Sequence, residues 1–155
     1  MKKYIVLVLI ALLMGALFVG VSAAPKAEHV YLYEKDAEWV IVDGGAWGKM
    51  QYKVEGSEFS FVFNGKGLVA DEDYTLIVYT PDEWPAEGLF VLGSDTASNN
   101  GNVHIAGLVF TDTLIDVKIW LVLSDDVEDA DPAKMIGWNP ASYLFENDLI
   151  TFTQD

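Results

Sequence analysis

The sequence predicts an all-β protein, a single antiparallel β-sandwich of immunoglobulin-like type with about nine strands. Three observations support this fold class. Short apolar runs recur at spacings of roughly 8–15 residues, with turn residues between them. Several runs alternate apolar and polar side chains with a period of two, which is typical of a half-buried strand. No segment carries a helical apolar stripe over three turns, and this argues against a parallel α/β sheet.

The clearest pair of strands is a predicted hairpin. Met50, Tyr52 and Val54 alternate with polar residues, and the phenylalanines of Phe59–Phe63 do the same after a turn at 55–57. The segment Tyr74–Thr80 is rich in residues that favour strands. The full set of predicted strands is Val30–Tyr33, Trp39–Val42, Met50–Val54, Phe59–Phe63, Tyr74–Thr80, Leu89–Leu92, Val103–Phe110, Leu114–Leu123 and Leu149–Phe152.

One or two short helical turns are expected near the C-terminus. Asp131 and Pro132 can begin one turn that ends near Met135. Asn139 and Pro140 form an N-cap followed by a proline at the first helical position, which predicts a second turn over Ala141–Phe145.

Residues 1–23 have the layout of a secretory signal peptide. Lys2 and Lys3 precede an apolar stretch, Tyr4–Val21, that we expect to be helical, and small residues lead to a cleavage site after Ala23. Cleavage leaves a β-sandwich domain of residues 24–155 that is secreted or displayed at the cell surface. The alternative is an uncleaved anchor, because an apolar stretch of this length is at the lower edge of a membrane span. The protein would then contact the membrane only through this segment.

Composition narrows the range of functions. The chain has 9 lysines, no arginine and 24 acidic residues, for a formal net charge of −15. Such a charge repels nucleic-acid phosphates and disfavours anionic partners, so the partner to expect is an envelope polysaccharide or a cell-surface protein and not a nucleic acid. The absence of cysteine excludes disulfides, thiol nucleophiles and thiolate metal sites.

The sequence contains no recognised catalytic motif. The two histidines, His29 and His104, are too few for a site that needs three or four imidazole ligands. Gly-x-Ser-x-Gly, Ser-x-x-Lys and His-Glu-x-x-His are all absent. We therefore expect a non-catalytic module with a structural or binding role. A small hydrolase that uses two carboxylates is a further alternative.

Two binding hypotheses remain beside the structural role. Trp47, Trp84 and Trp138 lie in turn-like contexts, where exposed indoles can stack on sugars, whereas Trp39 and Trp120 are expected in the core. A run of carboxylates offers hard oxygen ligands, and Ca²⁺ is the one cofactor that it suggests. Its members are Asp125, Asp126, Glu128, Asp129 and Asp131. Core packing of the tryptophans and a solvated acidic loop are the readings that we favour.

Seven short stretches together resemble a set of small exported proteins of methanogenic archaea. The resemblance covers most of residues 24–155 and implies an extracellular or envelope protein without an assigned activity, so no functional residue is carried over from it. The stretches are Tyr31–Asp36, Gly45–Met50, Phe61–Gly65, Tyr74–Ile77, Gly101–Ile105, Lys118–Val122 and Gly137–Pro140.

A more local pattern resembles the tyrosine corner of fibronectin type III and other immunoglobulin-like domains. Leu68 precedes a turn, and Tyr74 begins the next strand six residues later. In that corner the tyrosine is buried and its hydroxyl bonds to backbone a few residues upstream. Ala70 and Glu72 occupy the positions where the family has proline and threonine. The alternative is that Tyr74 is simply an inward-facing strand residue.

Overall fold

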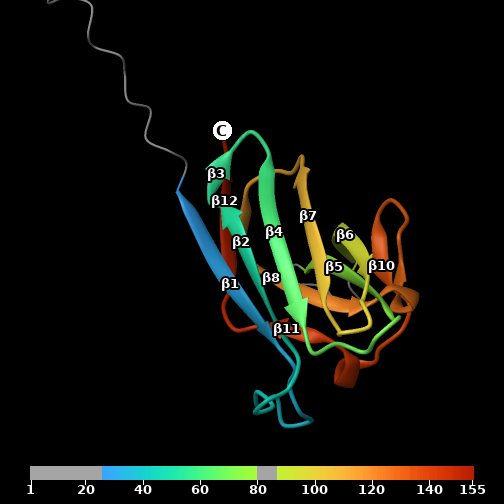
Figure 1. Ribbon diagram of the computed structural model, residues 1–155. Helices are drawn as coiled ribbons and strands as arrows, with labels where there is room; N and C mark the ends of the chain where they lie inside the picture. The colour runs from blue at the N-terminus through green and yellow to red at the C-terminus, as the bar shows by residue number, and fades with distance from the viewer. Residues whose placement is uncertain (1–25, 80–86) are drawn as a thin grey trace, which may run out of the picture.

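The protein is all-β and antiparallel, as predicted, in a computed structural model that describes residues 26–79 and 87–155 (Figure 1). Its strands form one strongly curled sheet, a half-barrel, and two short 3₁₀ turns lie near the C-terminus. The strands are β1 (Ala27–Tyr33), β2 (Trp47–Lys53), β3 (Glu55–Gly56), β4 (Phe59–Lys66), β5 (Asp73–Tyr79), β6 (Glu87–Thr96), β7 (Val103–Val109), β8 (Leu114–Leu123), β9 (Val127–Glu128), β10 (Ala133–Met135), β11 (Leu144–Glu146) and β12 (Ile150–Gln154).

The predictions for residues 1–23 and for Trp84 lie outside the described residues. Within the two described ranges there is no helix of the length and apolarity that crossing a membrane requires.

The sheet runs in the order β7-β4-β2-β1-β11-β8-β5-β6-β10-β9. One half, β7 to β1, consists of long strands lying side by side, and the strands β8 and β5 cross behind them in Figure 1. The short strand β11 pairs with β1 on one side and β8 on the other, so the two halves are joined into one sheet. The expected sandwich of two separate sheets is therefore a single curled one. Across the open side of the curled sheet, β7 and β6 approach each other, and the His104 amide of β7 donates to Asp95 Oδ2 of β6 at 2.8 Å.

The main core lies on the concave side of the sheet. The predicted hairpin is confirmed: β2 and β4 are antiparallel neighbours, with Met50 opposite Phe63 and Tyr52 opposite Phe61. These four side chains are buried, whereas the residues that alternate with them face outward. The inward phenylalanine Phe59 also contacts Phe152 of β12, ring edge to ring face, at 5.3 Å. The period-two pattern therefore places the apolar set of each strand in this core.

Strand β5 and the second half of β8, Ile119 to Val122, are buried on both faces, whereas Ile115 and Asp116 in the first half of β8 are exposed. Their inward residues join the main core, and their outward residues form a second cluster with the segment that follows β8. This segment returns over the outer face as residues 124–143, which include β9, β10 and the 3₁₀ turns Ser124–Asp126 and Pro140–Ser142. Near-continuous apolar runs such as the one in β8 are what two-sided burial requires.

Two of the predicted elements are wrong. The run Trp39–Val42 is not a strand but part of a loop, since its one β-bridge to the described residues is the isolated pair Lys35 and Ile41. The helical turn ending near Met135 is instead strand β10, which pairs with β6 and β9. The reason is that Ala133 is needed in the second cluster, where it lies buried opposite Leu89. The turn expected over Ala141–Phe145 is shorter than predicted, Pro140–Ser142.

The tyrosine-corner contact is present. Tyr74 is 1% exposed, and its hydroxyl oxygen accepts a hydrogen bond from the Val69 amide at 3.2 Å. Burial is the main cause that raises the pKa of Tyr74, so the hydroxyl stays neutral. The contact fixes the turn that carries the chain from β4 in one half of the sheet to β5 in the other.

We expect Tyr74→Phe to lower the free energy of unfolding by about 1 kcal/mol, because it removes this hydrogen bond but keeps the ring. Tyr52→Phe is the matched control, since Tyr52 is also buried but has no hydrogen bond from its hydroxyl to the described residues. Urea unfolding of both variants measures the difference. Equal losses in the two variants would contradict a role for the corner contact.

Candidate functional site

A row of aromatic side chains crosses the outward face of the sheet. Trp47 lies directly opposite Tyr33, Tyr33 opposite Phe145, and Phe145 opposite Trp120. Because directly opposed residues of antiparallel strands point to the same face, these four side chains form one line over β2, β1, β11 and β8. We call them the aromatic row. Its Trp120 end is covered by the returning segment, and its Trp47 end is open to solvent.

Two indoles flank the middle of this row and enclose a cleft. Trp39 contacts the Phe145 ring edge to face at 4.9 Å, and Trp138 contacts the same ring at 6.3 Å. The cleft has a volume of about 290 Å³, and Lys35, Asp36 and other residues of the β1–β2 loop complete its wall with Pro140. We call it the indole cleft. Trp39 is 55% exposed and Trp138 41% exposed, so both present ring surface to solvent.

Trp39 is held in a backbone conformation that few side chains adopt. Its φ is +62°, in the left-handed region, which costs a non-glycine residue on the order of 1–3 kcal/mol. The Asp36 side chain stabilises this turn because its Oδ1 accepts from the amides of Glu38 and Val40, at 3.0 and 2.9 Å. The Trp39 amide donates to the Asp36 carbonyl at 3.0 Å. These hydrogen bonds hold the Trp39 backbone in its strained conformation, and the ring is therefore kept in an exposed position.

The base of the same loop is tied to β1. Glu34 accepts at its side chain from the Ala46 amide at 2.9 Å, and its own amide donates to the Ala46 carbonyl. The Val42 amide donates to the Glu34 carbonyl at 3.0 Å. Figure 1 shows this loop projecting from the end of β1 and β2, beyond the sheet. The base of the loop that contains Trp39 is thus fixed to β1 by hydrogen bonds.

Trp138 is positioned by a buried polar network. The Asp126 carboxylate, 6% exposed, accepts from the Tyr143 hydroxyl at 2.5 Å and from Asn139 Nδ2 at 2.9 and 3.0 Å. The Asp126 carbonyl accepts from the amides of Ile136 and Gly137. Only glycine fits at 137, because a Cβ there would lie 1.9 Å from Asp126 Oδ1. The network holds both sides of Trp138 and so sets its place above Phe145.

Burial, followed by the hydrogen bond to Asp126, raises the pKa of Tyr143 far above its ordinary value. The hydroxyl therefore remains a donor to the Asp126 carboxylate at any physiological pH, and the network keeps its pattern of donors and acceptors.

The rim of the indole cleft retains polar groups for a ligand. Lys35 Nζ donates to the Glu146 carbonyl at 3.1 Å, which leaves two of its ammonium protons. Asp36 Oδ1 is occupied by two amides, and no residue in the described ranges bonds to Oδ2. The cleft therefore combines two flat apolar walls with a donor and an acceptor at the edge.

Two buried polar atoms belong to neighbours of Phe145 and lack a partner among the described residues. Trp120 Nε1 and Glu146 Oε2 have no hydrogen-bond partner among the described residues, although the indole is close enough to influence the carboxyl. Desolvation raises the pKa of Glu146, and a hydrogen bond to its own backbone, followed by Lys118, Trp120 and Lys35, offsets part of the shift. Because the pKa of Glu146 is raised in the folded protein, its ionisation at higher pH lowers stability.

Of the three tryptophans that the sequence singled out, the two within the described residues, Trp47 and Trp138, lie at different places. Trp138 is in the indole cleft. Trp47, 37% exposed, is at the open end of the aromatic row beneath Lys66, whose Nζ lies 5.7 Å from the ring centre. The prediction that Trp39 belongs to the core is wrong, because the Asp36 turn directs it outward. The same prediction for Trp120 is confirmed at 6% exposure.

The acidic run does not act as a unit. Asp126 is buried in the Trp138 network, whereas Asp125, Glu128, Asp129 and Asp131 are exposed, and Glu128 pairs with Lys134 at 2.7 Å. Across residues 26–79 and 87–155, no three histidine or acidic side chains converge as a metal site would need. The geometry thus gives Asp126 a structural role that its place in an acidic run did not indicate.

Comparison with known proteins returns no match to a family model, a curated protein or a solved structure. The function has therefore to be argued from the site itself.

We expect Asp126→Ala to destabilise the protein by about 2–4 kcal/mol, because the Tyr143 hydroxyl and the Asn139 amide lose a buried acceptor. Asp125→Ala, at the exposed neighbour, should change stability by no more than about 0.5 kcal/mol. Thermal unfolding of both variants makes the comparison. A small effect of Asp126→Ala, like that of the control, would mean that the network does not hold the Trp138 loop.

Glu146→Gln should stabilise the protein near neutral pH. Because the folded pKa is raised, ionisation of Glu146 lowers stability as pH rises from the unfolded pKa through the folded one. The neutral amide removes this loss, so the gain in melting temperature should be present at pH 7 and should shrink toward pH 4. A gain that is the same at both pH values would contradict the assignment.

Proposed function

We propose that the protein is an exported, non-catalytic module that binds carbohydrate in the indole cleft. The observation that carries the proposal is Trp39, a large apolar ring that is 55% exposed on a strained and heavily bonded backbone. A tryptophan that served the core would be buried, and an ordinary surface turn would have glycine, asparagine or aspartate at this position. Strain held in place by the surrounding structure is characteristic of ligand-binding positions.

The chemistry of the cleft suits a sugar ring. The faces of pyranose rings carry C–H groups that pack on flat aromatic surfaces, and the ring edges carry hydroxyls. Trp39 and Trp138 supply the flat surfaces, and Lys35 Nζ and Asp36 Oδ2 supply a donor and an acceptor at the rim. Aromatic walls with a few placed polar groups are the usual composition of a ligand site.

The volume of the cleft supports a small occupant. At about 290 Å³ it is at the lower edge of the usual range of ligand pockets, roughly 300–1,000 Å³. We therefore infer that it holds a single sugar ring and that the rest of a longer glycan lies outside it.

The proposal of a binding module, and not a hydrolase, rests on the carboxylates. Glycoside hydrolysis generally uses two carboxyl groups on either side of the scissile bond. Among the described residues, the cleft wall includes one, Asp36, and one of its oxygens accepts the two amides of the Trp39 turn. A group that holds the loop in place is poorly suited to transfer protons.

Trp39→Ala is expected to weaken glycan binding by about tenfold or more, because it removes one stacking wall. Ile41→Ala is the control, since Ile41 is exposed in the same loop but does not line the cleft. Calorimetric titration with a panel of envelope polysaccharides gives the affinities. If Trp39→Ala binds every glycan as the unchanged protein does, the proposed site is wrong.

A further inference from the structure

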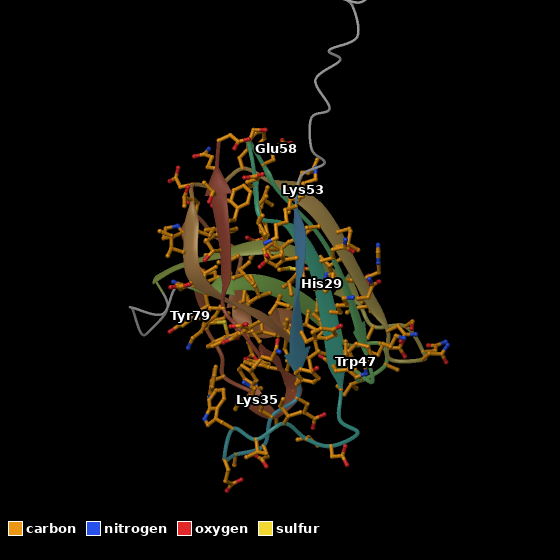
Figure 2. All side chains as sticks on the ribbon, turned by 90° about the vertical axis from the view of Figure 1, so that its left-hand side faces the viewer. His29, Lys35, Trp47, Lys53, Glu58 and Tyr79 are labelled. Carbon is orange, nitrogen blue, oxygen red and sulfur yellow. The ribbon has the colours of Figure 1, made fainter. Side chains whose placement is uncertain are left out.

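The outward face of β1, β2, β4 and β7 has an unusual charge. In a chain with 24 acidic residues, the outward positions of these four strands contain no aspartate or glutamate. They do contain Lys49, Lys53 and Lys66, together with His29 and His104. We call this surface the lysine face. Figure 2 shows His29, Trp47 and Lys53 along it.

Two of the three lysines of this face contact aromatic rings, and no described carboxylate forms an ion pair with them. Lys49 Nζ lies 5.6 Å from the centre of the Tyr31 ring, and Lys66 Nζ lies 5.7 Å from that of Trp47. A cation–π contact positions the ammonium group but leaves its charge unneutralised. Within the described part of the chain, the ion pairs are found elsewhere, between Lys26 and Glu28 and between Lys134 and Glu128.

The lysine face is continuous with the indole cleft. Phe145, in the wall of the cleft, is directly opposite Tyr33, and Tyr33 is directly opposite Trp47. Neighbouring strands are about 4.8 Å apart, so the aromatic row leads from the cleft to Trp47 in steps of that size. Lys35 lies at the cleft end of this path and Lys66 at the Trp47 end.

We propose that the ligand is an acidic glycan, which places one ring in the indole cleft and its following residues across Tyr33 and Trp47 onto the lysine face. The inference rests on the proposed function and adds the class of sugar to it. Carboxylate or sulfate groups of the glycan pair with the unneutralised ammonium groups of Lys49 and Lys66. The apolar faces of its rings pack against Tyr33 and Trp47, the two members of the aromatic row that reach solvent.

Charge density favours a glycan over a nucleic acid. The whole chain carries −15, and duplex DNA carries one charge per about 1.7 Å, so the two repel strongly. The net charge disfavours an acidic polysaccharide too, but such a polymer carries fewer charges per unit length than duplex DNA, so the repulsion that it meets is weaker. At physiological salt the Debye length is about 8 Å, which screens the distant acids more than the contacting lysines.

The test compares polyuronic acids with their methyl-esterified forms, which keep the backbone but lose the charge. Calorimetric titrations at 0.15 M NaCl should show the acidic form of at least one polymer binding ten or more times as tightly as its ester. The double variant Lys49→Gln/Lys66→Gln should lose this preference. The control double variant Lys26→Gln/Lys134→Gln, which changes the net charge equally, should keep it.

The outcomes separate the two proposals. Equal binding of acid and ester, with Trp39→Ala still weakening both, would overturn the acidic class and leave the cleft standing. Loss of the preference in both double variants would show a net-charge effect only and would also overturn it. Binding of oligothymidylate as tightly as the best acidic glycan would replace the glycan by a nucleic acid. No binding of any polymer would overturn both proposals.

Discussion

The rest of the structure depends on the pairing of one short strand, β11. Its three residues bond to β1 and to β8, and they close two sets of strands into a single curled sheet around the main core. The same pairing turns Leu144 inward and Phe145 outward. Phe145 is thereby placed at the centre of the aromatic row, where both exposed indoles contact it. The fold and the candidate site thus share one constraint.

Two polar loops fix the indoles before any ligand arrives. Asp36 does so for Trp39 with an exposed turn, and Asp126 does so for Trp138 with a buried network that reaches Tyr143. Rings that are already in place lose less conformational entropy on binding, which leaves more of the contact energy as affinity. The strain at Trp39 and the unpaired polar atoms at Trp120 and Glu146 are costs that the large core can carry.

The sequence predicted the strands whose pattern is local. The alternation in β2 and β4 and the long apolar runs of β5 and β8 sufficed for the all-β class. It did not predict the exposure of Trp39, because Trp39–Val42 is as apolar as a strand. Asp36, three residues before the tryptophan, favours a turn, but this is a weak cue. It also did not predict β11, which is too short to show an alternating pattern. The burial of Asp126 was missed because it depends on a hydrogen bond from Tyr143, which is far away in the sequence. The uneven distribution of charge emerged only when register placed the lysines on one face.

The central claim is that Trp39 and Trp138 form the walls of a sugar site. The chain has five tryptophans, and each indole N–H gives its own signal in a two-dimensional ¹H–¹⁵N NMR spectrum. The measurement is a titration of the isotope-labelled protein with an acidic oligosaccharide, followed at these five signals. The account predicts that the signals of Trp39 and Trp138 shift first and together, with Trp47 following as the chain length of the glycan grows. Shifts confined to other tryptophans, or none at saturating glycan, would contradict it.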